Sequence, residues 1–239
     1  QSIYNVLWGA PMLILLVGTH LFLTFRTRFI QASTFKAIKL SVTPDKEASG
    51  DVSSFAALAT ALAATIGTGN IVGVATAIAA GGPGAVFWCW LTGLFGMATK
   101  YGEGLLAVKY RVKTSDGMML GGPMYALENG LKQRWLGVAF AVFAGVACFG
   151  IGNMTQGNSI STMVQNNFHV SPFITGIVLT VGTGCVILRG VKSIAKVCEK
   201  LVPLMAGLYI LGCVIICIMN APYMVKAIAL IISSAFSEQ

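Results

Sequence analysis

Charged side chains are scarce in this sequence. Only 10% of its 239 residues are Asp, Glu, Lys or Arg, whereas a soluble domain carries about 25%. So little charge cannot cover the surface of a soluble domain of this length. The shortage therefore argues against a soluble enzyme, a disordered chain and a nucleic-acid-binding module. Hydrophobic residues make up 56% of the chain and glycine occurs 28 times. Both values favour a helical membrane protein with several spans and close contacts between helices.

Histidine and acidic residues are also few, and the cysteines are not arranged as metal ligands. The chain has two His, eight Asp and Glu, and six Cys, with no CxxC pair and no Cys beside a His. Cysteine within apolar runs behaves as a small hydrophobic residue. We therefore expect neither a zinc site nor a disulfide framework.

Uncharged stretches mark the expected membrane spans, since about 20 apolar residues in a helix cross a bilayer. The turn sequence Gly81-Gly82-Pro83-Gly84 divides one long uncharged stretch, and residues 166–172 divide another. We expect a single all-α polytopic domain over residues 1–239. Its six predicted spans lie at about 3–25, 52–80, 84–112, 135–164, 172–188 and 201–219.

Basic residues are unevenly distributed between the two ends of these spans. Fourteen of the 16 Lys and Arg residues lie on the side of the membrane where the first expected span ends. Lys226 lies on the other side, and Lys100 falls within a span. Cytoplasmic loops are enriched in Lys and Arg. We therefore expect a multi-pass protein of the cell inner or plasma membrane with its N-terminus outside.

The second expected span contains a point where a helix is weak. Its centre reads Ile66-Gly67-Thr68-Gly69-Asn70, in which glycine disfavours helix and Thr and Asn compete for backbone hydrogen bonds. A dinucleotide-binding loop is excluded, because no strand precedes it and no acidic residue follows about 20 positions later. Two interpretations stay open. Gly69 and Gly73 can form a GxxxG helix contact, or the helix is discontinuous and its freed backbone groups bind a substrate and a cation.

Several motifs give the chain a resemblance to a known family. They are Thr65-Ile66-Gly67-Thr68-Gly69-Asn70-Ile71-Val72-Gly73, Gly81-Gly82-Pro83-Gly84-Ala85-Val86-Phe87-Trp88, Gly96-Met97-Ala98-Thr99-Lys100-Tyr101-Gly102-Glu103, Leu106-Ala107-Val108-Lys109-Tyr110-Arg111 and Gly121-Gly122-Pro123-Met124-Tyr125. Together they resemble the alanine/glycine:cation (sodium) symporter family over essentially the whole sequence. The resemblance implies a leucine-transporter-like fold with one extra N-terminal helix and two inverted five-helix repeats. By that pattern, the chain holds the extra helix and the first repeat, and it ends at Gln239 with the second repeat missing.

The resemblance also implies a function and a set of site residues. The function is Na⁺-coupled symport of a small neutral amino acid, alanine or glycine, so the protein is not an enzyme and needs no cofactor other than Na⁺ as coupling ion. The implied substrate-binding residues are Thr68, Gly69, Asn70, Gln156 and Asn153. The implied sodium ligands, mainly backbone carbonyls, are Ala63, Thr65, Ile66 and Asn70. The expected partners are the amino acid, Na⁺, the lipid bilayer and the missing C-terminal half, with no nucleic acid.

Other functions stay open on the sequence alone. One is a membrane scaffold or half-length subunit that does not transport, and another is a channel, although only two spans carry polar clusters. A third is a carrier of another amino acid, such as glutamine, with H⁺ coupling. Saturable Na⁺-dependent uptake would separate the first interpretation from a scaffold or a channel.

Overall fold

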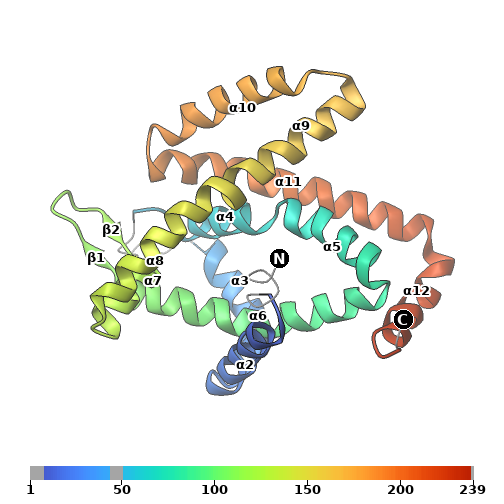
Figure 1. Cartoon of the computed structure of the whole chain (residues 1–239), viewed down its shortest axis with the longest axis horizontal. Coiled ribbons are helices and arrows are strands. Elements are labelled where there is room, and N and C mark those ends of the chain that lie inside the picture. The colour runs from blue at the N-terminus through green and yellow to red at the C-terminus, as the bar shows by residue number, and fades with distance from the viewer. Residues whose placement is uncertain (1–7, 44–50, 238–239) are drawn as a thin grey trace. The chain divides into compact units, whose positions relative to one another are not determined.

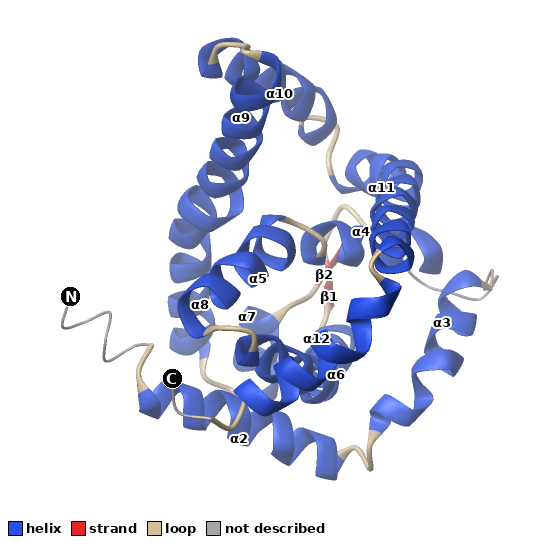
Figure 2. Ribbon diagram, turned by 90° about the vertical axis from the view of Figure 1, so that its right-hand side faces the viewer, coloured by secondary structure: helices blue, strands red, loops and turns tan. Residues whose placement is uncertain are grey.

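The computed structural model describes residues 8–43 and 51–237, with no side-chain detail for Ile151, and these residues are almost entirely helical (Figures 1 and 2). The chain divides into two compact units. The first combines the described residues of Gln1–Lys39 with Ala77–Gly137 and Lys226–Gln239. The second combines those of Leu40–Thr76 with Val138–Val225. The boundaries between the units fall within helices.

The first unit is built around one long helix, α6 (Gly84–Lys109). Its other elements are α2 (Ala10–Arg26), η1 (Ile30–Ser33), the start of α3 (Thr34–Val42), the strands β1 (Val112–Lys113) and β2 (Met119–Leu120), α7 (Pro123–Tyr125), the π-helical turn η2 (Ala126–Gly130) and the end of α12 (Ala221–Ser234). The expected first span thus corresponds to α2, and residues 3–7 of that expectation lie outside the described residues.

Helix α2 packs on α6 through polar as well as apolar contacts. His20 Nδ1 and Thr99 Oγ1 are hydrogen-bonded at 2.7 Å. Thr24 is completely buried, and its hydroxyl oxygen accepts a 2.9 Å hydrogen bond from Gln31 Nε2. Between Thr24 and Gln31 the chain turns through left-handed backbone at Arg28 and Phe29. These bonds satisfy polar groups that would otherwise be costly in an apolar environment.

The connection after α6 is an antiparallel hairpin, the only strand pairing in the described chain, and Figure 2 shows it in red. Val112 pairs with Leu120 and Lys113 with Met119. The turn between them includes Asp116-Gly117, and Gly117 has a φ of 80°. Asp-Gly is a favoured hairpin dipeptide because glycine adopts a positive φ without steric cost. The sequence expectation of an all-α chain therefore holds apart from this short hairpin.

The N-terminal end of α6 contacts the segment that follows α12. A Cβ atom added at Gly84 would lie 2.5 Å from the Ser234 carbonyl oxygen, so this approach requires glycine. Trp88 Nε1 donates a 3.2 Å hydrogen bond to the Ala235 carbonyl oxygen. Phe87, Trp88 and Phe236 form an aromatic cluster with ring centroids 5.3–5.9 Å apart. Edge-on aromatic pairs of this kind add to the energy of apolar burial.

The second unit contains the interrupted helix. Its elements are α4 (Ser54–Thr65), most of α5 (Thr68–Gly81), most of α8 (Arg134–Ala147), the π-helical segment η3 (Cys148–Met154), α9 (Thr155–Phe168), α10 (Pro172–Ile187) and α11 (Val191–Met219). The Ser53 side chain caps α4 by accepting a 3.1 Å hydrogen bond from the Ala56 amide, as N-cap serines do. Pro172 begins α10, a position at which proline suits a helix start.

Small side chains fill the contact between α4 and α11, which pack on each other. The most buried apolar residues of the two helices are Ala56, Ala59, Ala195 and Val202, each at most 4% exposed. Small residues let helix backbones approach closely, which is how helices commonly pack in membranes. The buried contact at Ala56 and Ala59 therefore holds α4 against α11.

Three helical stretches of the described chain are long and apolar enough to cross a membrane. They are Ser54–Gly81, Arg134–Phe168 and Val191–Met219, and the bent pair Ala10–Arg26 and Ile30–Val42, with a 64° bend, would make a fourth. These stretches support an all-α polytopic membrane protein. The charged α6 and the 16-residue α10 do not meet this test, so the division into six spans stays a prediction.

Candidate functional site

The interruption of the second expected span lies at Ile66 and Gly67. Helix α4 ends at Thr65 and α5 begins at Thr68, and Ile66 between them has extended backbone, with φ −81° and ψ 99°. Figure 1 draws α4 and α5 as two separate coiled ribbons. The helix is therefore interrupted at the glycine-rich point that the sequence predicts, and the binding of a substrate and a cation there stays a prediction. An interruption in an otherwise apolar span frees backbone polar groups, and such groups need a partner or a polar cavity.

The interruption presents amide hydrogens and carbonyl oxygens close together in the sequence. The first amides of α5, at Thr68 and Gly69, begin a helix and so have no acceptor within it. The Asn70 amide is already used, since it donates to the Gly67 carbonyl at 3.1 Å. At the other end, the last carbonyls of α4, including those of Ala63 and Thr65, have no donor within their helix. The interruption thus offers anion-binding amides and cation-binding carbonyls.

Gln156 lies against this interruption. The Thr68 hydroxyl donates a 3.0 Å hydrogen bond to Gln156 Oε1. A Cβ atom added at Gly67 would lie 3.6 Å from Gln156 Nε2, so the amide group also covers the glycine. Within the described part of the chain, Gln156 Nε2 has no hydrogen-bond acceptor. The Gln156 side chain therefore has two N–H groups to offer a ligand beside the first turn of α5.

The helix that carries Gln156 is irregular directly before it. Residues Arg134–Phe168 form one continuous helical stretch, but Cys148–Met154 within it is π-helical. The Thr155 hydroxyl donates to the Gly150 carbonyl at 3.3 Å across this segment. A π-helical turn inserts an extra residue and is frequent at functional sites. This π-helical segment sets the direction in which the Asn153 and Gln156 side chains project from the helix.

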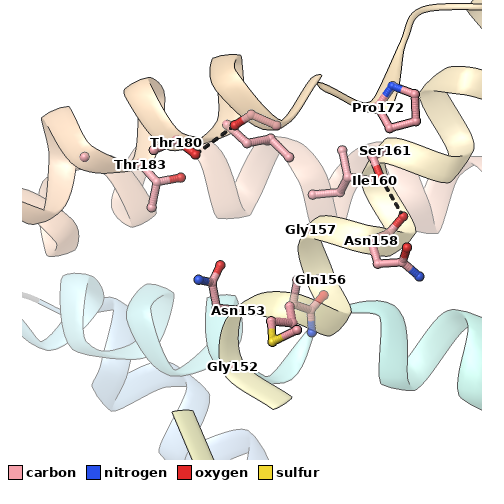
Figure 3. Close-up of a pocket in the computed structure, with 14 residues that line it drawn as sticks. Gly152, Asn153, Gln156, Gly157, Asn158, Ile160, Ser161, Pro172, Thr180 and Thr183 are labelled. Atoms are coloured by element: carbon pink, nitrogen blue, oxygen red, sulfur yellow. Dashed lines mark hydrogen bonds between the residues drawn. The ribbon is translucent and has the colours of Figure 1, made fainter. Parts of the chain in front are cut away.

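A cavity of about 720 Å³ opens between α10 and the η3–α9 stretch. Its polar lining residues are Asn153, Gln156, Asn158, Ser161, Thr180 and Thr183. In Figure 3, Thr180 and Thr183 lie on α10 across from Asn153 on the η3–α9 side. Polar side chains in membrane-embedded helices are costly unless they face protein, water or a ligand. Gln156 thus lines this cavity and also contacts the interruption through Thr68.

Helix ends and neutral oxygens dominate the electrostatics of this region. Helices α4, α5 and α9 contain no Asp, Glu, Lys or Arg. The described residues also contain no cluster of three or more His, Cys, Asp or Glu. A cation at the interruption would therefore be held by carbonyl, hydroxyl and amide oxygens, assisted by the negative C-terminal end of α4. An anion would face the positive N-terminal end of α5.

The structure brings some of the predicted site residues together. Thr68 and Gln156 are in direct contact, Gly69 and Asn70 follow in the first turn of α5, and Ala63, Thr65 and Ile66 lie at or just after the end of α4. The Thr65 hydroxyl donates back to the Ala61 carbonyl at 2.8 Å. Asn153 lines the cavity beside Gln156.

Sequence reasoning missed the contribution of α10 to the cavity. Thr180 and Thr183 line it together with Gly176 and Gly184. The available signal was the recurrence of small and hydroxyl residues in Thr180-Val181-Gly182-Thr183-Gly184 within an otherwise apolar helix. Such residues mark helix contacts as often as polar cavities, so the pattern alone does not select the cavity.

Comparison with known proteins identifies the family. The sodium:alanine symporter family model matches residues 1–239. The chain is 53% identical to the sodium/alanine symporter AgcS of Methanococcus maripaludis over 99% of this chain and 54% of AgcS. It is 54% identical to an uncharacterized transporter of Haemophilus influenzae over 100% of this chain and 53% of that protein. The chain thus spans about half the length of these curated relatives. It belongs to the sodium:alanine symporter family.

Proposed function

We propose that the full-length protein is a Na⁺-coupled symporter that carries a small neutral amino acid, alanine or glycine, across the cell membrane. The observation that carries this proposal is the interruption between α4 and α5 with Gln156 bound to Thr68. Discontinuous helices of this kind form the midplane sites of secondary transporters. Membership in the family and the identity to AgcS, whose name states alanine and sodium, support the choice of substrate and ion.

In this proposal the substrate carboxylate binds at the start of α5. The Thr68 and Gly69 amides belong to the first turn of α5, where unpaired amides and the helix dipole favour an anion. Gln156 Nε2 donates to the same carboxylate, while its Oε1 is held by the Thr68 hydroxyl. Asn153 contacts the substrate from the cavity side. A small amino acid suits a site defined by glycine, threonine and amide side chains.

The cation binds at the end of α4. The carbonyls of Ala63, Thr65 and Ile66 provide oxygen ligands, and the Asn70 side-chain oxygen completes this side of the site. Unwound carbonyls and half-helix C-termini coordinate Na⁺ in transporters of this type. Because the cation and the carboxylate bind at adjacent ends of the same interruption, each favours the other through its charge. This arrangement couples the binding of Na⁺ to the binding of the amino acid, and no chemical reaction is needed.

The wider architecture follows a leucine-transporter-like plan in this proposal. Helix α2 is the extra N-terminal helix, and the helices from α4 to α11 form one five-helix repeat. The relatives are about twice as long as this chain, a length that accommodates a second, inverted repeat as the partner that completes the pocket. Alternating access then arises when one repeat or bundle moves against the other around the fixed site. The N-terminus lies outside, as the distribution of Lys and Arg indicates.

Uptake into proteoliposomes tests the proposal. The protein expressed from its full reading frame is reconstituted, and uptake of radiolabelled alanine is measured with an inward Na⁺ gradient or an equal choline gradient. We expect saturable uptake only with Na⁺, competition by unlabelled glycine, and no effect of a protonophore when the membrane potential is clamped. Uptake that follows a pH gradient in the absence of Na⁺ would instead establish H⁺ coupling. Absence of uptake by folded protein would favour a scaffold.

A variant of Asn70 tests the cation site separately. Asn70→Ala removes a side-chain oxygen, so the Na⁺ concentration for half-maximal uptake should rise. If Asn70 only supports helix packing, the melting temperature without substrate should fall while the Na⁺ dependence stays unchanged. The second result would remove Asn70 from the site.

A further inference from the structure

We propose that residues Leu131–Trp135, the corner between η2 and α8, form a binding site for the phosphate headgroup of an anionic lipid. The sequence of this corner is Leu131-Lys132-Gln133-Arg134-Trp135, in which two apolar residues flank two cations. None of these residues belongs to the proposed transport site. The inference is therefore independent of the proposed function.

The corner is held by contacts with the end of α6, with α7 and with η2. A Cβ atom added at Gly130 would lie 3.0 Å from the Tyr110 ring, so the chain before the corner lies flat against that ring. A Cβ atom added at Gly137, just after the corner, would lie 2.8 Å from the Met124 carbonyl oxygen. Backbone bonds from Leu131 to Ala126 and from Gln133 to Leu127 fix the chain between these glycines. The corner is thus a rigid feature of the first unit.

The side chains of the corner project away from this support. Leu131 is 63% exposed, Trp135 is 68% exposed, and the Arg134 side chain is 84% exposed. Lys132 is also exposed and lies in left-handed backbone with φ 58°. The Trp135 indole donates a 3.0 Å hydrogen bond to Gln133 Oε1, which fixes the orientation of the ring. Two cations and two large apolar side chains therefore face the surroundings together.

This combination fits the boundary between lipid headgroups and acyl chains. Trp is favoured at that boundary because its ring is amphipathic, and Leu131 adds apolar area beside it. Arg and Lys within reach of an anionic membrane surface each contribute about fivefold in affinity, and Arg also forms charge-assisted hydrogen bonds to phosphate. Within residues 8–43 and 51–237, one carboxylate is paired with these cations, since Glu128 Oε1 lies 3.7 Å from Arg134 Nε. The net charge of the corner stays positive.

Native mass spectrometry of the detergent-purified protein from the full reading frame tests the site. The protein is titrated with phosphatidylglycerol, with zwitterionic phosphatidylcholine and with inorganic phosphate. We expect retention of phosphatidylglycerol in preference to phosphatidylcholine. Lys132→Gln/Arg134→Gln should weaken phosphatidylglycerol binding about 25-fold and leave phosphatidylcholine binding unchanged. Glu128→Gln should strengthen phosphatidylglycerol binding, because it removes the carboxylate that competes for Arg134.

Matched variants make the test specific. Lys192→Gln/Lys226→Gln removes two exposed cations from other helices, and we expect it to change phosphatidylglycerol affinity by less than about fivefold, the contribution of a single cation. Equal losses in the two double variants would overturn the proposal, because binding would then follow total charge. Displacement of phosphatidylglycerol by millimolar inorganic phosphate would also overturn it, in favour of a free-phosphate site. If the corner variant is poorly folded, as judged by its melting temperature, unchanged binding by Glu128→Gln still contradicts the proposal.

Discussion

The Thr68 hydroxyl donates a 3.0 Å hydrogen bond to Gln156 Oε1, which joins two residues 88 positions apart in the sequence. Thr68 is the first residue of α5, and Gln156 is the second residue of α9. The bond orients the Gln156 amide so that its nitrogen, rather than its oxygen, is available beside the first amides of α5. A single contact therefore determines the donor arrangement of the proposed carboxylate site.

Replacement of Thr68 tests this orientation. Thr68→Val keeps the shape of the side chain but removes the hydroxyl, so the Gln156 amide can rotate and Oε1 loses its donor. Loss of one partner of such a bond costs about 1.4 kcal/mol, and the KM for alanine should rise about tenfold in proteoliposome uptake. Thr68→Ser keeps the hydroxyl and should retain a KM within about threefold of the original. Equal KM values for the two variants would contradict the role of the bond.

Substitution of Gly69 distinguishes a role in substrate binding from a role in helix packing. A Cβ atom at Gly69 or at Gly73 would meet no described heavy atom within 4 Å apart from its chain neighbours and the nearby backbone of its own helix. Leucine is compatible with membrane insertion, so Gly69→Leu should insert normally but abolish alanine uptake, because its side chain fills the space of the carboxylate. Gly73→Leu, one turn further along α5, should retain uptake. If the two glycines form a packing contact, both variants should lose thermal stability to a similar degree.

The contact between α4 and α11 should be sensitive to side-chain volume. Ala59 is 2% exposed, and α4 packs on α11. Ala59→Leu would overpack this contact at a cost of about 1–3 kcal/mol, which corresponds to a fall of several degrees in Tm. Ala61 on the same helix is exposed, and Ala61→Leu should leave the Tm nearly unchanged. The comparison is made by thermal unfolding in detergent, and a greater loss for Ala61→Leu would show that the contact lies elsewhere.

Cysteine labelling tests the orientation in the membrane. In a background in which the six native cysteines are replaced by alanine, Ser2→Cys should react with an impermeant thiol reagent in intact cells. Ser41→Cys should react only after the membrane is permeabilised. The reason is that fourteen of the 16 Lys and Arg residues fall on the side of Ser41. Labelling of Ser41→Cys alone in intact cells would reverse the topology.

Local sequence patterns predicted the interruption of the helix because its causes are local. Glycine at 67 and 69, with Thr68 between them and Asn70 after, lowers the local helix propensity, and the helix is interrupted between α4 and α5 at this point. The contact of Gln156 with this point was expected only through the family resemblance. No local pattern could show it, because the two residues lie on separate helices and meet only through tertiary packing.

Other features depend on tertiary structure that the sequence did not reveal. The turn at Arg28 and Phe29 uses left-handed backbone without glycine, so no residue type marks it. The π-helical segment Cys148–Met154 differs from an α-helix by its hydrogen-bond offset and not by its composition. The hairpin has strands of only two residues each, too short for alternation to appear. Its Asp116-Gly117 turn was the one local signal available.

The central claim is that Gln156 and the interruption between α4 and α5 form one site in which Na⁺ and alanine bind cooperatively. Equilibrium binding of radiolabelled alanine to the purified full-length protein, measured against Na⁺ concentration, tests it most directly. Na⁺ should raise alanine affinity, and alanine should raise Na⁺ affinity by the same factor, because coupling between bound ligands is reciprocal. Gln156→Leu should lose alanine binding, while Gln165→Leu, which replaces an exposed glutamine on the same helix, should keep it. Alanine binding that is independent of Na⁺, or that survives in Gln156→Leu, would contradict the account.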